Sequence, residues 1–194
     1  MVGDNKRAAL IANAADNGDA RGRQEYVQQE TEALRQLGFI PEELDLRDYF
    51  NGTSNLQNTL SKYGLLWILG GNTFILRRAM VQSGFDIAAR KFIETDQLVY
   101  AGFSAGSCAV TPDLHGLELV DDPDVVPTGY NSEIIWEGMG LVDFAIAPHF
   151  QSNHPESLAV DKVVDYFQEH GINFLKLRDG EVILVNSYQH QIVS

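Results

Sequence analysis

The sequence is short of cysteine, of basic residues and of long apolar runs. A single cysteine, Cys108, excludes an internal disulfide framework and is typical of a reducing compartment. Lys and Arg number 14 against 27 Asp and Glu, which gives a formal net charge of −13. Nucleic acid and anionic membrane surfaces repel such a chain. We therefore expect a cytoplasmic protein that binds neither nucleic acid nor membrane.

The sequence shows no segment with the pattern of a membrane span or of a signal peptide. No apolar run approaches the ~20 residues of a membrane span. Residues 8–15 are too short for the apolar region of a signal peptide, and Asp16 and Asn17 follow at once. No repeat, linker or low-complexity tract divides the 194 residues, a length that suits one domain. We expect a single catalytic domain over residues 1–194.

Strand and helix patterns alternate through the first half of the chain. The expected strands are residues 7–13, 40–46, 65–69 and 97–101. The expected helices are residues 23–37, 73–80 and 85–94. Apolar runs that alternate with helical spacing are typical of β-α-β units. They predict an α/β fold, a three-layer sandwich around a mostly parallel sheet.

The second half is less regular. Strand signals lie near residues 117–120 and 134–136, and an apolar strand is expected over 141–147. Residues 155–170 read as a helix, with Pro155 in its first turn. Residues 173–177 and 181–186 predict an antiparallel hairpin that turns at residues 178–180.

The most informative segment is residues 98–107, LVYAGFSAGS. A β-type run ends there in Gly-x-Ser-x-Gly, the pattern of a nucleophile elbow, in which a sharp strand-to-helix turn exposes a serine. A Cβ at Gly102 or Gly106 would press on the serine or on the neighbouring strand. The helix that follows directs unpaired N–H groups toward Ser104, where an oxyanion would form. The segment predicts Ser104 as a nucleophile.

A serine hydroxyl needs a general base within hydrogen-bond reach. His149 directly follows an expected strand in the run APHF, so it leaves the carboxyl edge of the sheet, where Ser104 also emerges. It is therefore the expected base. The other histidines, expected in loops, at a helix end and in the C-terminal segment, are His115, His154, His170 and His190.

A carboxylate must orient the base, and the segment between Ser104 and His149 offers three. Glu118 has apolar neighbours on both sides, which suits a partly buried orienting role, so it is the expected third member. Asp121 and Asp122, in an acidic turn, remain alternatives.

An oxyanion hole needs two preorganised donors. The backbone amide of Ala105 is the first. Gly71 ends a neighbouring strand in the run GGNT, where glycine lets the backbone approach a carbonyl, and its amide is the expected second donor. Asn72 is expected beside the substrate, fixing this loop or capping the next helix.

Cofactor motifs are not found. The serine loop lacks the Lys and Ser/Thr of a P-loop, and no Gly-x-Gly-x-x-Gly follows the first strand. The spacing of His149 and His154 matches no compact zinc motif. We expect no cofactor and no metal.

Three segments together resemble the peptidase E family of serine peptidases. They are residues 70–74 (GGNTF), 102–106 (GFSAG) and 148–150 (PHF). The resemblance implies a class I glutamine amidotransferase-like fold and dipeptidase-like cleavage of short peptides through an acyl-enzyme. By position, it gives Ser104 the role of nucleophile, His149 that of base, and Gly71 a place in the oxyanion hole.

The chain departs from that family at two places. Its aspartyl dipeptidases carry an aspartate near the position of Glu118, so a Ser-His-Glu triad or a shifted loop that uses Asp121 is implied. They also carry an arginine in the helix after the histidine, which binds the substrate carboxylate. Residues 157–163 contain none, and Lys162 is a point charge rather than a bidentate fork. Lys162 is thus the remaining candidate for substrate binding, and aspartate specificity is not expected.

Two other functions fit parts of the pattern. An esterase of the α/β-hydrolase type would share the chemistry, but its histidine lies near the C-terminus, whereas further strands are expected after His149. A regulatory small-molecule binder could keep the fold without catalysis. An amidotransferase is not expected, because its nucleophile is a cysteine where this chain has Ser104, and Cys108 is expected to face the core. A monomer and a homodimer are equally compatible with the sequence.

Overall fold

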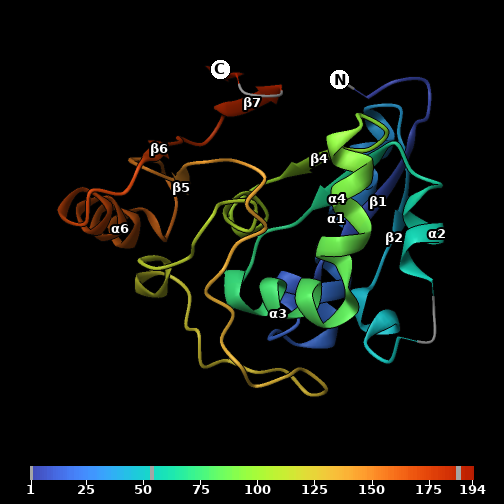
Figure 1. Ribbon diagram of the computed structural model, residues 1–194, viewed down its shortest axis with the longest axis horizontal. Coiled ribbons are helices and arrows are strands. Elements are labelled where there is room, and N and C mark those ends of the chain that lie inside the picture. Colours follow the sequence, from blue (N-terminus) through green and yellow to red (C-terminus); the bar gives the residue numbers. More distant parts are fainter. Residues whose placement is uncertain (1, 53–54, 187–188) are drawn as a thin grey trace.

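The computed structural model describes residues 2–52, 55–186 and 189–194 (Figure 1). Its main sheet has four parallel strands in the order β2-β1-β3-β4. These strands are β1 (Arg7–Ile11), β2 (Ile40–Glu43), β3 (Leu65–Ile68) and β4 (Val99–Gly102). The segments between them contain α1 (Ala20–Gln36), α2 (Leu56–Leu60), α3 (Thr73–Ser83) and α4 (Phe85–Glu94). The predicted α/β fold with a mostly parallel sheet is confirmed.

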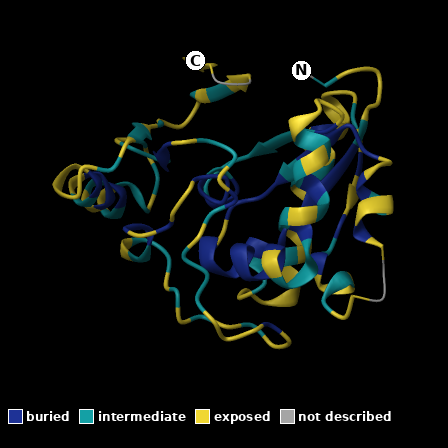
Figure 2. Cartoon of the chain, in the orientation of Figure 1, coloured by how far each residue is buried: buried dark blue, intermediate teal, exposed yellow. Residues whose placement is uncertain are grey.

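The two faces of the main sheet pack against different helices. On β1, Ala9 and Ile11 face a core that includes the apolar residues of α2, α3 and α4. Ala8 and Leu10 face the opposite way, toward Leu34 of α1. All four residues are fully buried, and β1 is accordingly dark blue along most of its length in Figure 2. Successive strand residues point to opposite faces, so the sheet is the middle of three layers.

Polar caps set the ends of the helices beside the sheet. Asp19 accepts hydrogen bonds from the N–H groups of Arg21 and Gly22, at 3.1 and 2.9 Å, so α1 begins three residues earlier than its apolar spacing predicts. Asn72 caps α3 by accepting the N–H of Ile75 at 3.0 Å. At the other end of α3, Gly84 has a φ of 73°, the left-handed conformation common at helix ends.

The second half contains two small sheets. In the first, β5 (Ala145–Ala147) pairs in parallel with β6 (Phe174–Lys176), and α6 (Ser157–Glu169) connects them. In the second, β7 (Val182–Asn186) pairs antiparallel with β8 (Gln189–Val193). Figure 1 shows α6, β5 and β6 together at one side of the main sheet.

The predicted hairpin of residues 173–177 with 181–186 is therefore wrong. Val160, Val163 and Phe167 of α6 are buried against β5, in one core with Ala145 and Ala147. Because α6 packs against β5, the segment after α6 lies beside β5. β6 therefore forms its backbone hydrogen bonds with β5 and not with β7. The expected turn at residues 178–180 becomes the connection between the two small sheets.

Smaller corrections follow from local hydrogen bonding. The strand signal near residues 117–120 is the 3₁₀ helix η3 (Leu117–Leu119), in which Val120 donates to the carbonyl of Leu117 at 3.0 Å. Residues 134–136 form no strand. Pro155 lies before α6 rather than in its first turn. No helix in the described ranges is long and apolar enough to cross a membrane.

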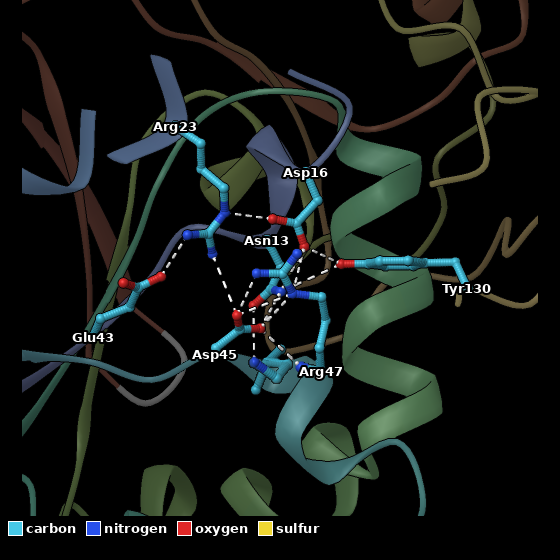
Figure 3. Close-up of polar contacts among 8 residues, drawn as sticks. Asn13, Asp16, Arg23, Glu43, Asp45, Arg47 and Tyr130 are labelled. Atoms are coloured by element: carbon cyan, nitrogen blue, oxygen red, sulfur yellow. Dashed lines mark hydrogen bonds and ion pairs between the residues drawn. The ribbon is translucent and has the colours of Figure 1, made fainter. Parts of the chain in front are cut away.

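A buried polar network joins the end of β1 to three other segments (Figure 3). The Asn13 amide donates to Asp16 and Asp45 at 2.9 and 3.1 Å, and its carbonyl oxygen accepts the N–H of Leu46 at 3.1 Å. Asp16, whose side chain is fully buried, accepts from Arg23 of α1 and from the Tyr130 hydroxyl. These hydrogen bonds and ion pairs hold α1 and the segment that ends at Tyr130 against the sheet.

We predict that Asp45→Asn makes stability less dependent on pH. Burial by itself would raise the pKa of Asp45, but hydrogen bonds from Arg47 and Asn13 outweigh it and hold this pKa below its ordinary value. A lowered folded-state pKa stabilises the fold above about pH 4 and loses that contribution as the pH falls through the folded value. The variant should lose about 1–3 kcal/mol at pH 7, and much less at pH 3.

Urea unfolding of both proteins at pH 7 and pH 3 measures this difference. Asp165→Asn, at an exposed position of α6, is the control and should change stability little at either pH. A deficit for Asp45→Asn that is equal at both pH values, or grows in acid, would contradict the prediction.

Candidate active site

Ser104 lies at a sharp turn between β4 and the short helix α5 (Ala105–Cys108). Its φ of 50° and ψ of −122° are a strained combination for a residue with a side chain. The turn closes because glycines flank it: a Cβ at Gly102 would come within 2.8 Å of the Gly106 backbone, and one at Gly106 within 2.4 Å of the Ile68 carbonyl oxygen. The strand-turn-helix form that the sequence predicts is present.

Ser104 lines an open cleft of about 410 Å³ at the carboxyl edge of the main sheet. Gly70 and Gly71 lie beside it on the loop after β3. Other lining residues come from the segment between β1 and α1 and from the first turns of α1, which include Arg23. His149 also lines this cleft. The structure thus brings the predicted nucleophile, base and glycine loop to one place.

His149 follows β5 directly and is paired with a carboxylate. Its Nδ1 lies 2.6 Å from Oδ1 of Asp179. The N–H of Asp179 in turn donates to the Ser152 hydroxyl at 2.8 Å. The Nε2 atom of His149 is buried and has no hydrogen-bond partner among the described residues, Ser104 included. The parallel pairing of β5 with β6 brings Asp179 here, since each of the two residues follows one of these strands.

None of the three predicted carboxylates is hydrogen-bonded to His149 in the described part of the chain, which corrects the expected triad geometry. Oε2 of Glu118 accepts the N–H of Gly116 at 2.6 Å. Oδ2 of Asp121 accepts the N–H of Thr73 at 2.8 Å, at the start of α3, and burial raises the pKa of this carboxyl. Asp122 accepts the N–H of Asp124. Each carboxylate accepts the N–H of a nearby backbone amide, and the carboxylate that His149 contacts is that of Asp179.

Sequence reasoning missed Asp179 because it placed this residue in a hairpin turn. The signal that could have found it was the end of β6 itself. If the sequence is interpreted with residues 173–177 as a parallel partner of the strand before His149, both strands end at the same edge of a sheet. Asp179 then follows one strand and His149 the other, so the two side chains are expected to lie close together.

The two predicted oxyanion donors lie next to Ser104. No hydrogen bond within the described part of the chain uses the N–H of Ala105 or of Gly71. Gly71 has a φ of 135°, and a Cβ there would come within 2.5 Å of the Ala14 carbonyl oxygen. A Cβ at Gly70 would be 3.0 Å from Cβ of Ser104, so the glycine loop approaches the serine closely.

The two residues predicted to bind substrate do not face the cleft. Asn72 is buried, caps α3 and donates to the Asp122 carbonyl at 2.8 Å, so it fixes the loop as expected, and it is not among the residues that line the cleft. Lys162 is exposed on α6 and is not among the residues that line the cleft. Arg23 does line it, but its guanidinium is paired with Asp16 at 2.5 Å and Glu43 at 2.7 Å.

Cys108 ends α5 and is buried in the core beneath β5 and α6, as the sequence predicts. Burial raises the pKa of its thiol well above the ordinary value. Its Sγ lies 3.8 Å from the Ile146 carbonyl oxygen. The thiol therefore acts as a small apolar side chain.

The fold belongs to the α/β class with a mostly parallel central sheet. The chain superimposes with a TM-score of 0.79 on a solved structure of a Listeria monocytogenes protein described as a "Putative Peptidase E Protein", over 100% of this chain and 87% of that one, at 23% identity. The model of Peptidase family S51 matches residues 1–193. The chain therefore belongs to family S51 and is a peptidase, which confirms the resemblance that the three segments indicate.

Curated relatives agree with this family. The chain is 30% identical over 165 residues to the Listeria innocua protein "Uncharacterized peptidase Lin0382", with 81% of this chain and 75% of that protein covered. It is 26% identical over 170 residues to a Drosophila melanogaster protein named "Probable alpha-aspartyl dipeptidase", and 29% identical over 147 residues to "Peptidase E" of Streptomyces coelicolor. The matched parts cover 85% and 73% of this chain and 65% and 56% of those relatives.

We predict that Cys108 reacts slowly with thiol reagents in the folded protein. Because burial raises the pKa of the thiol and covers its sulfur, little thiolate is exposed to reagent at pH 8. Titration with an aromatic disulfide reagent should show reaction only over hours, whereas the same protein in urea should release one equivalent within minutes. Stoichiometric reaction of the folded protein within minutes would contradict the buried position.

Proposed function

We propose that this chain is a serine peptidase of the dipeptidase type, which cleaves short peptides through an acyl-enzyme on Ser104. One observation carries the proposal. Ser104, in a nucleophile-elbow turn, lines the same cleft as His149, and Nδ1 of His149 is hydrogen-bonded to the carboxylate of Asp179. Membership of family S51 supports the peptide substrate. We further propose that residues 1–194 act as one catalytic domain, in the cytoplasm and without a cofactor.

The reaction begins with attack of Ser104 Oγ on the scissile carbonyl carbon. Nε2 of His149 accepts the hydroxyl proton, and Asp179 holds the ring in the required tautomer and stabilises the imidazolium that forms. The buried Nε2 has no described partner, so it can accept this bond once substrate orients the hydroxyl. Asp179 thus takes the role that the sequence predicts for Glu118.

The tetrahedral intermediate places negative charge on the former carbonyl oxygen. The amides of Gly71 and Ala105 donate to this oxyanion. Collapse breaks the peptide bond, and His149 returns its proton to the leaving amine. Water then attacks the acyl-enzyme ester with His149 again as base, which frees the acid product and restores Ser104.

The charges around the cleft bear on the substrate. Arg23 is the arginine among the residues that line the cleft, and its charge is neutralised by Asp16 and Glu43. Asp19 and Glu156, which also line the cleft, add negative charge. A carboxylate on the substrate would therefore meet no unpaired Lys or Arg among the residues that line the cleft. We propose substrates whose N-terminal residue is neutral or basic rather than aspartate.

We predict that Ser104→Ala abolishes peptide hydrolysis, by a factor of at least 10³, with little change in thermal stability. A fluorophosphonate probe should label the parent protein at Ser104 and leave the variant unlabelled, as read by mass spectrometry. An esterase would give the same labelling but would cleave esters and spare dipeptides. A parent protein that takes up no probe would favour the non-catalytic binder, and unchanged turnover in the variant would overturn the proposed nucleophile.

We predict that Asp179→Asn lowers kcat by about 10²–10⁴ with a smaller effect on KM, because an amide cannot stabilise the imidazolium. Glu118→Gln is the matched control, since glutamine can still accept the N–H of Gly116, and its kcat should stay within about twofold of the parent. The reverse pattern, with Glu118→Gln inactive and Asp179→Asn active, would restore Glu118 as the orienting acid.

A further inference from the structure

A second histidine and a carboxylate lie against the proposed base. His149, His154 and Glu156 each offer a ligand atom, and these three atoms lie within 4.8 Å of one another. The rings of His149 and His154 are stacked, with their centroids 3.7 Å apart and their planes at 7°. The proposed chemistry gives no role to the side chain of His154 or of Glu156.

His149 is prepared as a metal ligand by its surroundings. Metal-binding histidines usually donate the N–H of one ring nitrogen to a carboxylate, which fixes the ring and raises the basicity of the other nitrogen. Nδ1 of His149 has such a partner in Asp179, at 2.6 Å. Its Nε2 is a buried polar atom with no partner in the described part of the chain. A bound cation would satisfy it.

The other two donors can approach this nitrogen. Nδ1 of His154 accepts the N–H of Glu156 at 3.3 Å, so Nδ1 carries the lone pair of this ring. It lies 3.8 Å from Oε2 of Glu156, and a metal would take the place of the long hydrogen bond. Both residues lie between β5 and α6, outside any strand or helix, and are only partly buried. Donors about 3.3 Å apart fit tetrahedral zinc, whose bonds to nitrogen and oxygen are about 2.0–2.2 Å. The ligand atoms lie within 4.8 Å of one another, so each pair must move closer by about 1.5 Å at most to reach this donor separation. Rotation of the His154 and Glu156 side chains closes this gap and also separates the stacked rings.

Charge and access also favour a cation. The three residues line the open cleft beside Ser104, so an ion can enter from solvent. The carboxylates of Glu156 and Asp179 lie near the site, and the cleft's arginine is already paired with Asp16 and Glu43. Two imidazoles and one carboxylate are a donor set that suits zinc.

We propose that His149, His154 and Glu156 form a site for one Zn²⁺ ion, and that its binding inhibits the peptidase. The metal bonds to the lone pair of Nε2, so this nitrogen can no longer accept the proton of Ser104. Inhibition is reversible, because removal of the ion frees the same lone pair. The binding site stands on the geometry alone, whereas the inhibitory effect rests on the proposed function.

The test separates binding from hydrolysis. Calorimetric titration of Ser104→Ala with Zn²⁺ should show one site per chain, although this variant lacks the proposed nucleophile. Adding His154→Ala or Glu156→Gln to this background should weaken binding at least tenfold. His115→Ala is the matched control, because Nδ1 of His115 also pairs with an aspartate, Asp113 at 2.6 Å, but lies outside the cluster. It should leave the affinity unchanged.

The parent protein then tests the consequence. Its peptide hydrolysis should fall with added Zn²⁺ at the concentration that half-fills the site, and EDTA should restore it. Each variant is compared with its own metal-free rate, and His154→Ala should need at least tenfold more Zn²⁺ for the same inhibition. Failure of Ser104→Ala to bind Zn²⁺, or binding insensitive to both substitutions, would overturn the site. Metal binding without inhibition would overturn its regulatory role. A parent protein that hydrolyses no peptide overturns the proposed function instead, and the titration still decides the site.

Discussion

The close approach of three strand ends at one edge of the main sheet is the constraint on which the site depends. Gly106 packs against the Ile68 carbonyl oxygen, Gly71 against that of Ala14, and Gly70 against Ser104, with no space for a Cβ at the first two positions. These contacts put the ends of β1, β3 and β4 together. The positive φ of Ser104 is maintained because the tight backbone contacts around it allow no relaxation. A strained serine and two unused amide donors are the result.

The second constraint is long-range strand pairing. His149 and Asp179 are 30 residues apart, yet their side chains meet because β5 and β6 run parallel and end at the same edge. Packing of α6 against β5 produces that pairing. The carboxylate behind the histidine is therefore supplied by the chain after the base, and not by the segment between nucleophile and base. This order changes which acid is proposed for the chemistry while leaving the serine and the histidine in place.

The polar network around Asn13 connects stability to the cleft. Arg23 belongs to both, since it lines the cleft and pairs with Asp16 and Glu43. Because the positive charge of Arg23 is paired within the network, Asp19 and Glu156 leave the cleft with a net negative charge. The same character underlies the proposed preference against acidic peptides and the proposed affinity for a cation. The ion pairs of Arg23 with Asp16 and Glu43 therefore support both the proposed substrate preference and the proposed zinc site.

The sequence by itself determined the features that depend on neighbouring residues. The alternation of strands and helices, the glycine-flanked turn at Ser104, the place of His149 after a strand and the capping role of Asn72 all follow from local pattern, and the structure contains each of them. The tertiary structure alone decided the partner of β6, the position of Asp179, the exposure of Lys162 and the pairing of Arg23. A strand's pattern of side chains specifies which faces are buried but not which strand lies beside it. Glu118 illustrates the limit: its apolar neighbours correctly indicated a partly buried carboxylate, but only the folded chain shows that this carboxylate accepts the N–H of Gly116, two residues earlier.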